Sequence, residues 1–281
     1  MDDANDSAAE PPSNTVFISD FPLDPASDGT TLTLRDDRLA FPAFIDAASS
    51  CRRRGIRFRL IDQGRLTPSE LEWLGQAGAD IYTSDRARQA LAEFVLMRKS
   101  AVRGGALVAY FHHGPLADEP AAGVVPFEAL REMGLSGIDI HISDDKGERD
   151  AARLAELADD CSRGGAVFVL YRHGPLGEAQ ENLARRGAWI HVSNATLAGD
   201  DEVRFLCDCV DAARKAGSNV ILHVDAGISA SVAGEIMAKG GIVLFKTPPS
   251  DYRSPLRRVE DAAKRFRLSP RSYYLFTDFV L

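Results

Sequence analysis

One pattern occurs four times along this 281-residue chain and restricts its fold more than any other feature. A glycine is followed by a short run of β-branched and aromatic residues, then by a helical pattern and a second such run. The copies begin at Gly55, Gly104, Gly164 and Gly217. Glycine commonly ends the preceding helix, and each copy must stack on its neighbours to bury its apolar face. The repeat therefore predicts strict alternation of strands and helices.

Eight strands are expected, at residues 57–61, 80–83, 106–112, 138–142, 166–172, 188–192, 219–224 and 242–246. The spacing of roughly 22 to 32 residues leaves room for one crossover helix between parallel strands. Right-handed crossovers without a reversal favour an α/β fold, a (βα)8 TIM-like barrel made of four degenerate two-strand repeats. Residues 15–281 would form this single domain. An open parallel sheet and a repeat solenoid are the alternatives.

The two ends of the chain differ from the repeats. Residues 1–14 contain four carboxylates and no basic side chain, a composition typical of disorder. Two further strand-like runs, at 16–20 and 273–277, lie outside the eight. We expect them to pair with each other or to close one end of the barrel.

Charge and cysteine content limit the partners and the compartment. The net charge is −8, and half of the excess lies in the tail, so the mildly acidic folded part argues against nucleic acid as the main partner. No apolar run reaches the length of about 18 residues that a membrane span needs. The four cysteines do not form a secreted-type framework, which predicts a reduced, cytoplasmic protein. Oligomeric state is not indicated.

All six histidines fall on the expected strands or at their ends. The C-terminal ends of barrel strands form the active-site face, and histidine changes charge near neutral pH. The candidate catalytic residues are His112, His113, His173, His141, His191, Asp225 and Asp62. The alternative is structural: copied histidines can simply bond to a neighbouring strand. No zinc-type spacing occurs, so no metal site is predicted, and no cofactor is indicated.

Equivalent positions in the repeats carry these candidates. Counted back from the glycine that follows each first strand, one slot contains Asp62, His112, Arg172 and Asp225. Glycine after this slot permits a sharp turn or close approach to a ligand. In the second strands, His141 and His191 alternate with isoleucine and valine and should therefore face the barrel axis.

Barrels often bind phosphate with the loops after strands seven and eight. Here those loops, residues 225–231 and 246–255, offer glycine, serine and basic side chains. The predicted ligand-binding residues for a small anionic or phosphorylated molecule are Arg172, Gly227, Ser229, Ser231, Lys246 and Arg253. A capped helix and a surface turn would explain the same residues.

Short polar pairs follow alternate strands at residues 84–85, 143–144 and 193–194. We expect their oxygens to cap the helices that follow. Arg57 and Arg59 lie on one face of an expected strand. We expect them to pair with Asp80 or Asp139 inside the barrel; the alternative is that the other face of this strand is the buried one.

Residues 189–245 contain a strand that ends in serine, then a helix, the run AGSNVILHV and a further helix. This stretch, less than a quarter of the chain, resembles a sulfate-transporter and anti-sigma-antagonist (STAS) domain. The resemblance implies a regulatory or partner-binding role for Ser193 or Ser143. Two functions therefore follow: a barrel enzyme that uses His/Asp acid–base chemistry on a small anionic metabolite, or a non-catalytic repeat protein or regulatory module that binds a ligand or a partner.

Overall fold

The computed structural model describes residues 31–119, 125–144, 149–197, 199–224 and 228–245; the tail, the outer strand-like runs and most of the two expected phosphate loops lie outside them. The described chain forms one sheet of nine parallel strands in chain order. The strands are β1 (Thr31–Arg35), β2 (Arg57–Ile61), β3 (Ala79–Ser84), β4 (Val108–His112), β5 (Asp139–Ser143), β6 (Phe168–Arg172), β7 (Trp189–Ser193), β8 (Val220–Val224) and β9 (Ile242–Phe245).

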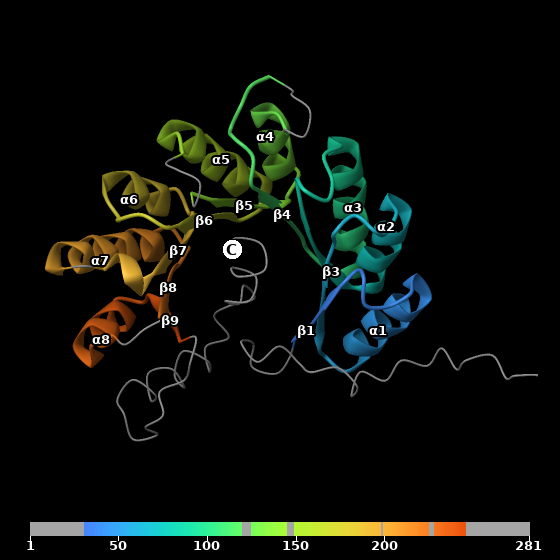
Figure 1. Ribbon diagram of the computed structural model, residues 1–281, viewed down its shortest axis with the longest axis horizontal. Coiled ribbons are helices and arrows are strands. Elements are labelled where there is room, and N and C mark those ends of the chain that lie inside the picture. The colour runs from blue at the N-terminus through green and yellow to red at the C-terminus, as the bar shows by residue number, and fades with distance from the viewer. Residues whose placement is uncertain (1–30, 120–124, 145–148, 198, 225–227, 246–281) are drawn as a thin grey trace, which may run out of the picture.

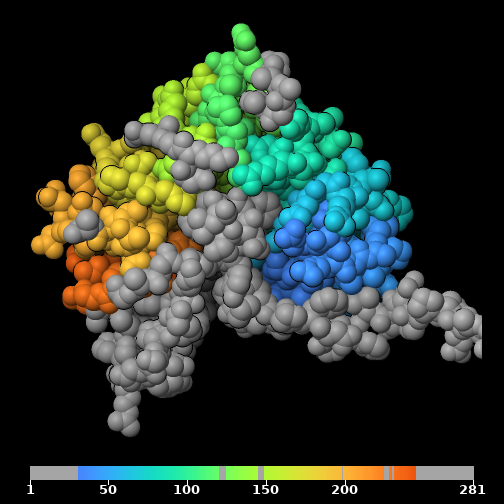
Figure 2. Space-filling model, in the orientation of Figure 1, coloured from blue at the N-terminus to red at the C-terminus, as the bar shows by residue number. Residues whose placement is uncertain are grey.

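Helices alternate with these strands. They are α1 (Phe41–Arg53), α2 (Pro68–Ala77), α3 (Leu91–Gly104), α4 (Phe127–Leu135), α5 (Ala151–Gly164), α6 (Glu178–Arg185), α7 (Asp200–Lys215) and α8 (Ala230–Ala238), with a short 3-10 turn at Asn194–Thr196. The sheet curves into an arch with the helices along its outer side, and β1 and β9 lie at the two ends of the arch (Figure 1). The successive elements stack in chain order around this arch (Figure 2).

The architecture is consistent with an α/β barrel, the class that the repeat predicts. All eight neighbouring strand pairs are parallel, so the C-terminal ends of the strands lie along one edge of the sheet. We call this edge the C-terminal rim. The polar residues that follow the strands are therefore brought to the same side of the molecule.

The expected number of strands was one too low. The run TLTLR at 31–35 is a strand that pairs with β2, from Thr31 opposite Arg57 to Arg35 opposite Ile61. Leu32 and Leu34 enter the core beneath the helices. Two leucines in so short a run carry little pattern by themselves, and this strand is defined by the neighbour with which it pairs.

Local signals explain where several helices begin and end. At α2 the Thr67 hydroxyl accepts the backbone N–H of Glu70, and the Glu70 carboxylate accepts that of Thr67 at 2.7 Å. This capping box satisfies two N–H groups that the helix leaves without partners. Gly78 then ends α2 with φ of 101°, a left-handed conformation that favours glycine.

Alternate strand residues form two apolar layers. One side of the sheet packs against the helices and forms the main core, while the inner side carries a smaller cluster that includes Ile61, Tyr82, Phe111 and Tyr171. Among the described helices, none has the length and apolar content needed to cross a bilayer.

Two pairs of helices approach each other through glycine. A Cβ atom added at Gly104 of α3 would lie 2.0 Å from the carbonyl oxygen of Gly75 in α2. The same addition at Gly164 of α5 would lie 2.1 Å from the carbonyl oxygen of Gly134 in α4. The contacts link α2 to α3 and α4 to α5, so the same close approach recurs at the spacing of the sequence repeat.

Candidate functional site

Carboxylates at the ends of β1, β3 and β5 bind the turn that follows the next strand along the sheet. Asp36 follows β1, and its Oδ2 accepts the backbone N–H groups of Gln63 at 3.0 Å and Arg65 at 2.9 Å. Asp85 and Asp144 occupy the same position after β3 and β5. The carboxylates of Asp85 and Asp144 therefore hold neighbouring loops together rather than capping the helices that follow them, which corrects the expectation of helix caps there. At the third pair the expectation is confirmed, because the Ser193 hydroxyl accepts the Ala195 N–H at 3.2 Å and caps the 3-10 turn.

The Asp85 cluster consists of Asp85, His112, His113, Gly114 and Pro115. Asp85 Oδ2 accepts the backbone N–H groups of His113 at 2.7 Å and Gly114 at 2.8 Å, and Oδ1 lies 2.8 Å from His113 Nδ1. His112 Nδ1 lies 3.2 Å from Oδ2. Burial by itself would raise the pKa of Asp85, but the contacts from His112, His113 and the Gly114 N–H outweigh it and hold this pKa well below its ordinary value.

Asp85 also determines how His113 can react. Because an ionised carboxylate only accepts hydrogen bonds, the contact places the ring hydrogen of His113 on Nδ1. Nε2 then carries the lone pair of the neutral ring. The His113 side chain retains 11% exposure, in contrast to His112, whose side chain is fully buried. The cluster thus contains one oriented imidazole at the C-terminal rim.

The Asp144 cluster consists of Asp144, Arg172, His173, Gly174 and Pro175. Asp144 Oδ1 accepts the His173 backbone N–H at 2.7 Å, and Oδ2 accepts Arg172 Nη1 at 2.6 Å. Arg172 also donates from Nε and Nη2 to the Pro175 carbonyl, at 3.0 and 2.8 Å. Arg172, a predicted anion ligand, is thus bound to Asp144 and Pro175.

Arg149 connects the turn of the Asp85 cluster to Ser143, the residue before Asp144. Its Nη1 donates to the Gly114 carbonyl at 2.8 Å, its Nη2 to the His113 carbonyl at 3.3 Å, and its Nε to the Ser143 carbonyl at 3.0 Å. The backbone of the His113 turn is therefore held by Asp85 through its N–H groups and by Arg149 through its carbonyl groups.

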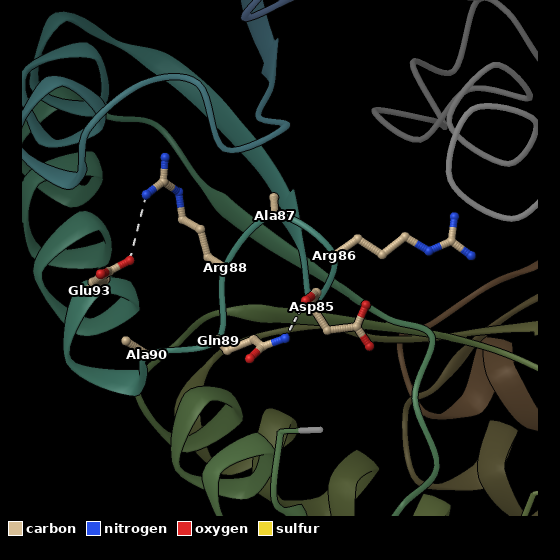
Figure 3. Close-up of a pocket in the computed structure, with 7 residues that line it drawn as sticks. All are labelled: Asp85, Arg86, Ala87, Arg88, Gln89, Ala90 and Glu93. Carbon is tan, nitrogen blue, oxygen red and sulfur yellow. Dashed lines mark hydrogen bonds and ion pairs between the residues drawn. The ribbon is translucent and has the colours of Figure 1, made fainter. Parts of the chain in front are cut away.

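A cavity of about 380 Å³ lies beside Asp85, in the loop between β3 and α3. Its lining residues are Asp85, Arg86, Ala87, Arg88, Gln89, Ala90 and Glu93. Arg86 and Arg88 point to opposite sides of this loop, with Arg88 directed toward Glu93 on α3 at 3.6 Å (Figure 3). Arg88 is buried and paired with Asp62, whereas Arg86 is exposed. Arg86 is therefore the accessible cation next to the Asp85 cluster.

The inner side of the sheet carries a continuous row of six rings with one guanidinium at its end, each side chain at most 2% exposed. The row is Arg59, Tyr82, Phe111, His141, Tyr171, His191 and His223. His141 Nδ1 lies 2.9 Å from Tyr171 Oη, and His191 Nδ1 lies 2.8 Å from His223 Nε2. His141 and His191 therefore face inward, as the alternation predicts, but they are buried in a different layer from the Asp85 cluster.

Asp62, one of the two carboxylates predicted to be catalytic, makes contacts that hold the fold together. Asp62 lies on the helix side of the sheet at 1% exposure. Its Oδ2 accepts Arg88 Nε at 2.6 Å and the Thr83 hydroxyl at 2.7 Å. Arg57 likewise pairs with Asp80, with Nε 2.8 Å from Oδ2, as expected from the sequence. Both carboxylates are therefore bound to arginines.

The expected phosphate loops are described only in part. Ser229 caps α8 by accepting the Val232 N–H at 3.2 Å, and its hydroxyl lies 3.2 Å from that of Ser231. Asp225, Gly227, Lys246 and Arg253 lie outside the described residues. Counted from the start of its strand, the position of His112 and Arg172 is occupied in the fourth copy by Val224 rather than by Asp225, and Asp62 lies one residue beyond that position in the first copy.

Sequence reasoning missed the role of Asp85 and Asp144, and it did not consider Arg149. The two aspartates recur after alternate strands, always one strand before a turn that ends in glycine. In a parallel sheet in chain order this spacing makes the carboxylate and the turn neighbours, which was the available signal. Within the part of the chain that the structure describes, no three His, Cys, Asp or Glu side chains are grouped as metal ligands would be.

No family model matches the sequence, and no curated protein matches it. Among solved structures, the chain is similar to a mandelate racemase/muconate lactonizing protein from Herpetosiphon aurantiacus, with 14% identity, a TM-score of 0.37 and coverage of 81% of this chain but only 55% of that one. A deoxyribose phosphate aldolase from Aeropyrum pernix gives 14% identity and a TM-score of 0.33, with coverage of 83% of this chain and 89% of that one. A type I 3-dehydroquinate dehydratase from Clostridium difficile gives 11% identity and a TM-score of 0.35, with coverage of 74% of this chain and 92% of that one.

Proposed function

We propose that this protein is a barrel-like enzyme that uses His–Asp acid–base chemistry on a small anionic or phosphorylated metabolite at its C-terminal rim. The observation that carries the proposal is the 2.8 Å contact between Asp85 Oδ1 and His113 Nδ1. A carboxylate that orients an imidazole fixes its tautomer and stabilises the imidazolium formed when the ring accepts a proton. His113 would be the general acid or base, and Asp85 would position it.

Two further features support this proposal. The adjacent hollow, about 380 Å³ in volume and open to solvent, is large enough for a small polar molecule. Arg86 is one of the lining residues, and its exposed guanidinium extends away from the loop on the side opposite Arg88 (Figure 3), where it would attract a carboxylate or phosphate group that approaches the rim. The C-terminal ends of parallel barrel strands are also where enzymes of this class hold their active sites.

The proposal can be tested by thermal unfolding of the full chain with small carboxylates, inorganic phosphate and phosphate esters. A ligand that binds only the native state raises the unfolding temperature. We expect His113→Gln and Arg86→Gln to reduce that shift by at least half. Arg103→Gln, at the exposed end of α3 away from the rim, should preserve it. A ligand response that survives in both rim variants would remove this site from the proposal.

A second candidate function is supported by a different observation. Asp62, Asp144 and Arg172 are all engaged in contacts between neighbouring loops. A repeat protein that binds a ligand or a partner without catalysis needs such rigid loops and no acid or base. In that case the ligand response would depend on Arg86 but would be the same for His113→Gln and the unsubstituted protein.

A further inference from the structure

Arg149 differs from the other arginines that bind the loops of the C-terminal rim. Three arginines there donate to a backbone carbonyl group of a loop and also pair with a carboxylate: Arg88, Arg153 and Arg172. Arg149 donates to three carbonyl oxygens, but in the part of the chain that the structure describes it forms no ion pair with a carboxylate. Carbonyl groups accept its hydrogen bonds without neutralising its charge. Arg149 is therefore a cation at the rim that lacks a counter-ion among the described residues.

The contacts of Arg149 also leave some of its donors unused. A guanidinium carries five N–H bonds in a planar fork. Nε donates to the Ser143 carbonyl, Nη1 to that of Gly114 and Nη2 to that of His113, so one N–H bond remains on each Nη. The three contacts hold the fork in one orientation, and Arg149 is partly exposed. An oriented pair of charged donors is the arrangement that binds two oxygens of one phosphate or carboxylate group.

The neighbouring carboxylates are bound to other donors. Asp85 accepts backbone N–H groups of the His113 turn, the same turn whose carbonyl groups Arg149 binds. Asp144 follows Ser143 in the chain but accepts the Arg172 guanidinium at 2.6 Å. A charge that is partly removed from water is costly unless it is paired. An external anion would supply the pairing that these two carboxylates do not.

We propose that Arg149 is the residue that binds the anionic group of the ligand, a phosphate or a carboxylate, beside the His113 turn. The inference rests on the proposed function for the class of ligand and names the side chain that holds its anionic end. The exposed Arg86 would attract the anion, and the oriented Arg149 would fix it. The ligand would then be held against the turn that carries the proposed acid–base residue.

Arg153 is the matched control. It lies four residues further along the chain, in the first turn of α5, and donates to the Leu116 carbonyl of the same loop after β4. Its charge is paired with Asp118 at 2.7 Å. Arg153→Gln therefore removes a loop contact of the same kind without removing a cation that lacks a counter-ion. A purely structural role for Arg149 predicts similar effects of the two substitutions on anion binding.

The test is calorimetric titration of the full chain with inorganic phosphate and, separately, with acetate, at constant ionic strength. Arg149→Gln should weaken the binding of at least one of these anions by at least about tenfold, because charge-assisted hydrogen bonds are lost. Arg153→Gln should change the affinity by less than about twofold. Arg149→Lys, which keeps the charge but loses the fork, should lie between the two. Circular dichroism shows whether each variant folds.

A second measurement on the unsubstituted protein decides the question if Arg149→Gln does not fold. Phenylglyoxal modifies accessible arginines, and mass spectrometry identifies the modified positions. Saturating phosphate or acetate should slow the modification of Arg149 and leave that of Arg153 unchanged. Equal rates at Arg149 with and without either anion would overturn the inference.

Three results of the titration would also overturn it: anion affinity in Arg149→Gln equal to that of the unsubstituted protein, equal weakening in Arg149→Gln and Arg153→Gln, or no saturable binding in the millimolar range. A response that requires Arg86 and His113 but not Arg149 would leave the proposed function standing while this inference falls. A response that requires Arg149 but not His113 would support the anion site and remove the acid–base function.

Discussion

The Asp85 and Asp144 clusters are built on the same backbone plan but differ in what the carboxylate binds. Asp144 receives one backbone N–H and a guanidinium. Asp85 receives two backbone N–H groups and two imidazoles, one of which is partly exposed. Arg172 in one cluster thus takes the place of His112 in the other, while each cluster carries a histidine, His173 or His113, at the next position. The 2.8 Å contact between Asp85 Oδ1 and His113 Nδ1 is the reason that the proposed chemistry is assigned to the Asp85 cluster.

Removal of the carboxylates tests the comparison most severely. We expect Asp144→Ala to lower the free energy of unfolding by about 3–5 kcal/mol, because Arg172 keeps its charge when its buried partner is lost. Asp85→Ala should fall toward the lower end of that range, because it leaves the neutral backbone N–H groups of His113 and Gly114, rather than a guanidinium, without their acceptor. Urea denaturation measures both values.

The control for the carboxylates is Asp118→Ala, which removes a 71% exposed carboxylate paired with Arg153. An exposed ion pair contributes at most about 1 kcal/mol. Should Asp85→Ala or Asp144→Ala cost no more than this control, the clusters would not be holding the loops together.

The close approaches of α2 to α3 and of α4 to α5 test whether the repeats that carry the Asp85 and Asp144 clusters are also equivalent away from the rim. Gly104→Ala and Gly164→Ala should each lower the free energy of unfolding by about 3 kcal/mol, because the new methyl group meets a backbone carbonyl. We expect the two costs to agree within about 1 kcal/mol, a typical uncertainty of such comparisons.

Ala216 occupies the corresponding place before Gly217, so Ala216→Gly is the matched control. This substitution should lower the free energy of unfolding by no more than about 1 kcal/mol. A substitution at Gly104 or Gly164 that is as mild as this one would mean that the helices can separate freely.

The acid response of Asp85 is the smallest expected effect. Asp85→Asn should lower stability by about 1–3 kcal/mol at pH 6 to 7, because the charge is lost while the shape is kept. Since the folded protein lowers the pKa of Asp85, the advantage of the unsubstituted protein is present above the ordinary aspartate pKa of about 4 and declines as the pH falls below it. Urea denaturation at pH 3 to 7 measures the difference, and a gap that widens on acidification would contradict the assignment.

The placement of individual residues shows which sequence arguments succeed. The alternation of histidine with isoleucine and valine placed His141 and His191 on the inner side, because successive strand residues point to opposite faces. The same rule would have placed His112 on the helix side, with Tyr110 and Val108. Treating the strand ends as one polar ring combined side chains from two layers that the sheet separates.

The sequence by itself determined the alternation of strands and helices, the positions of eight strands and the α/β barrel class, because these depend on local periodicity and on glycine at helix ends. Only the tertiary structure decided that TLTLR is a strand, and that Asp85 orients His113 while Asp144 binds Arg172. Those contacts join residues about 28 positions apart. They depend on which strands are neighbours in the sheet, and that is set by packing between segments far apart in the chain rather than by the periodicity within one segment.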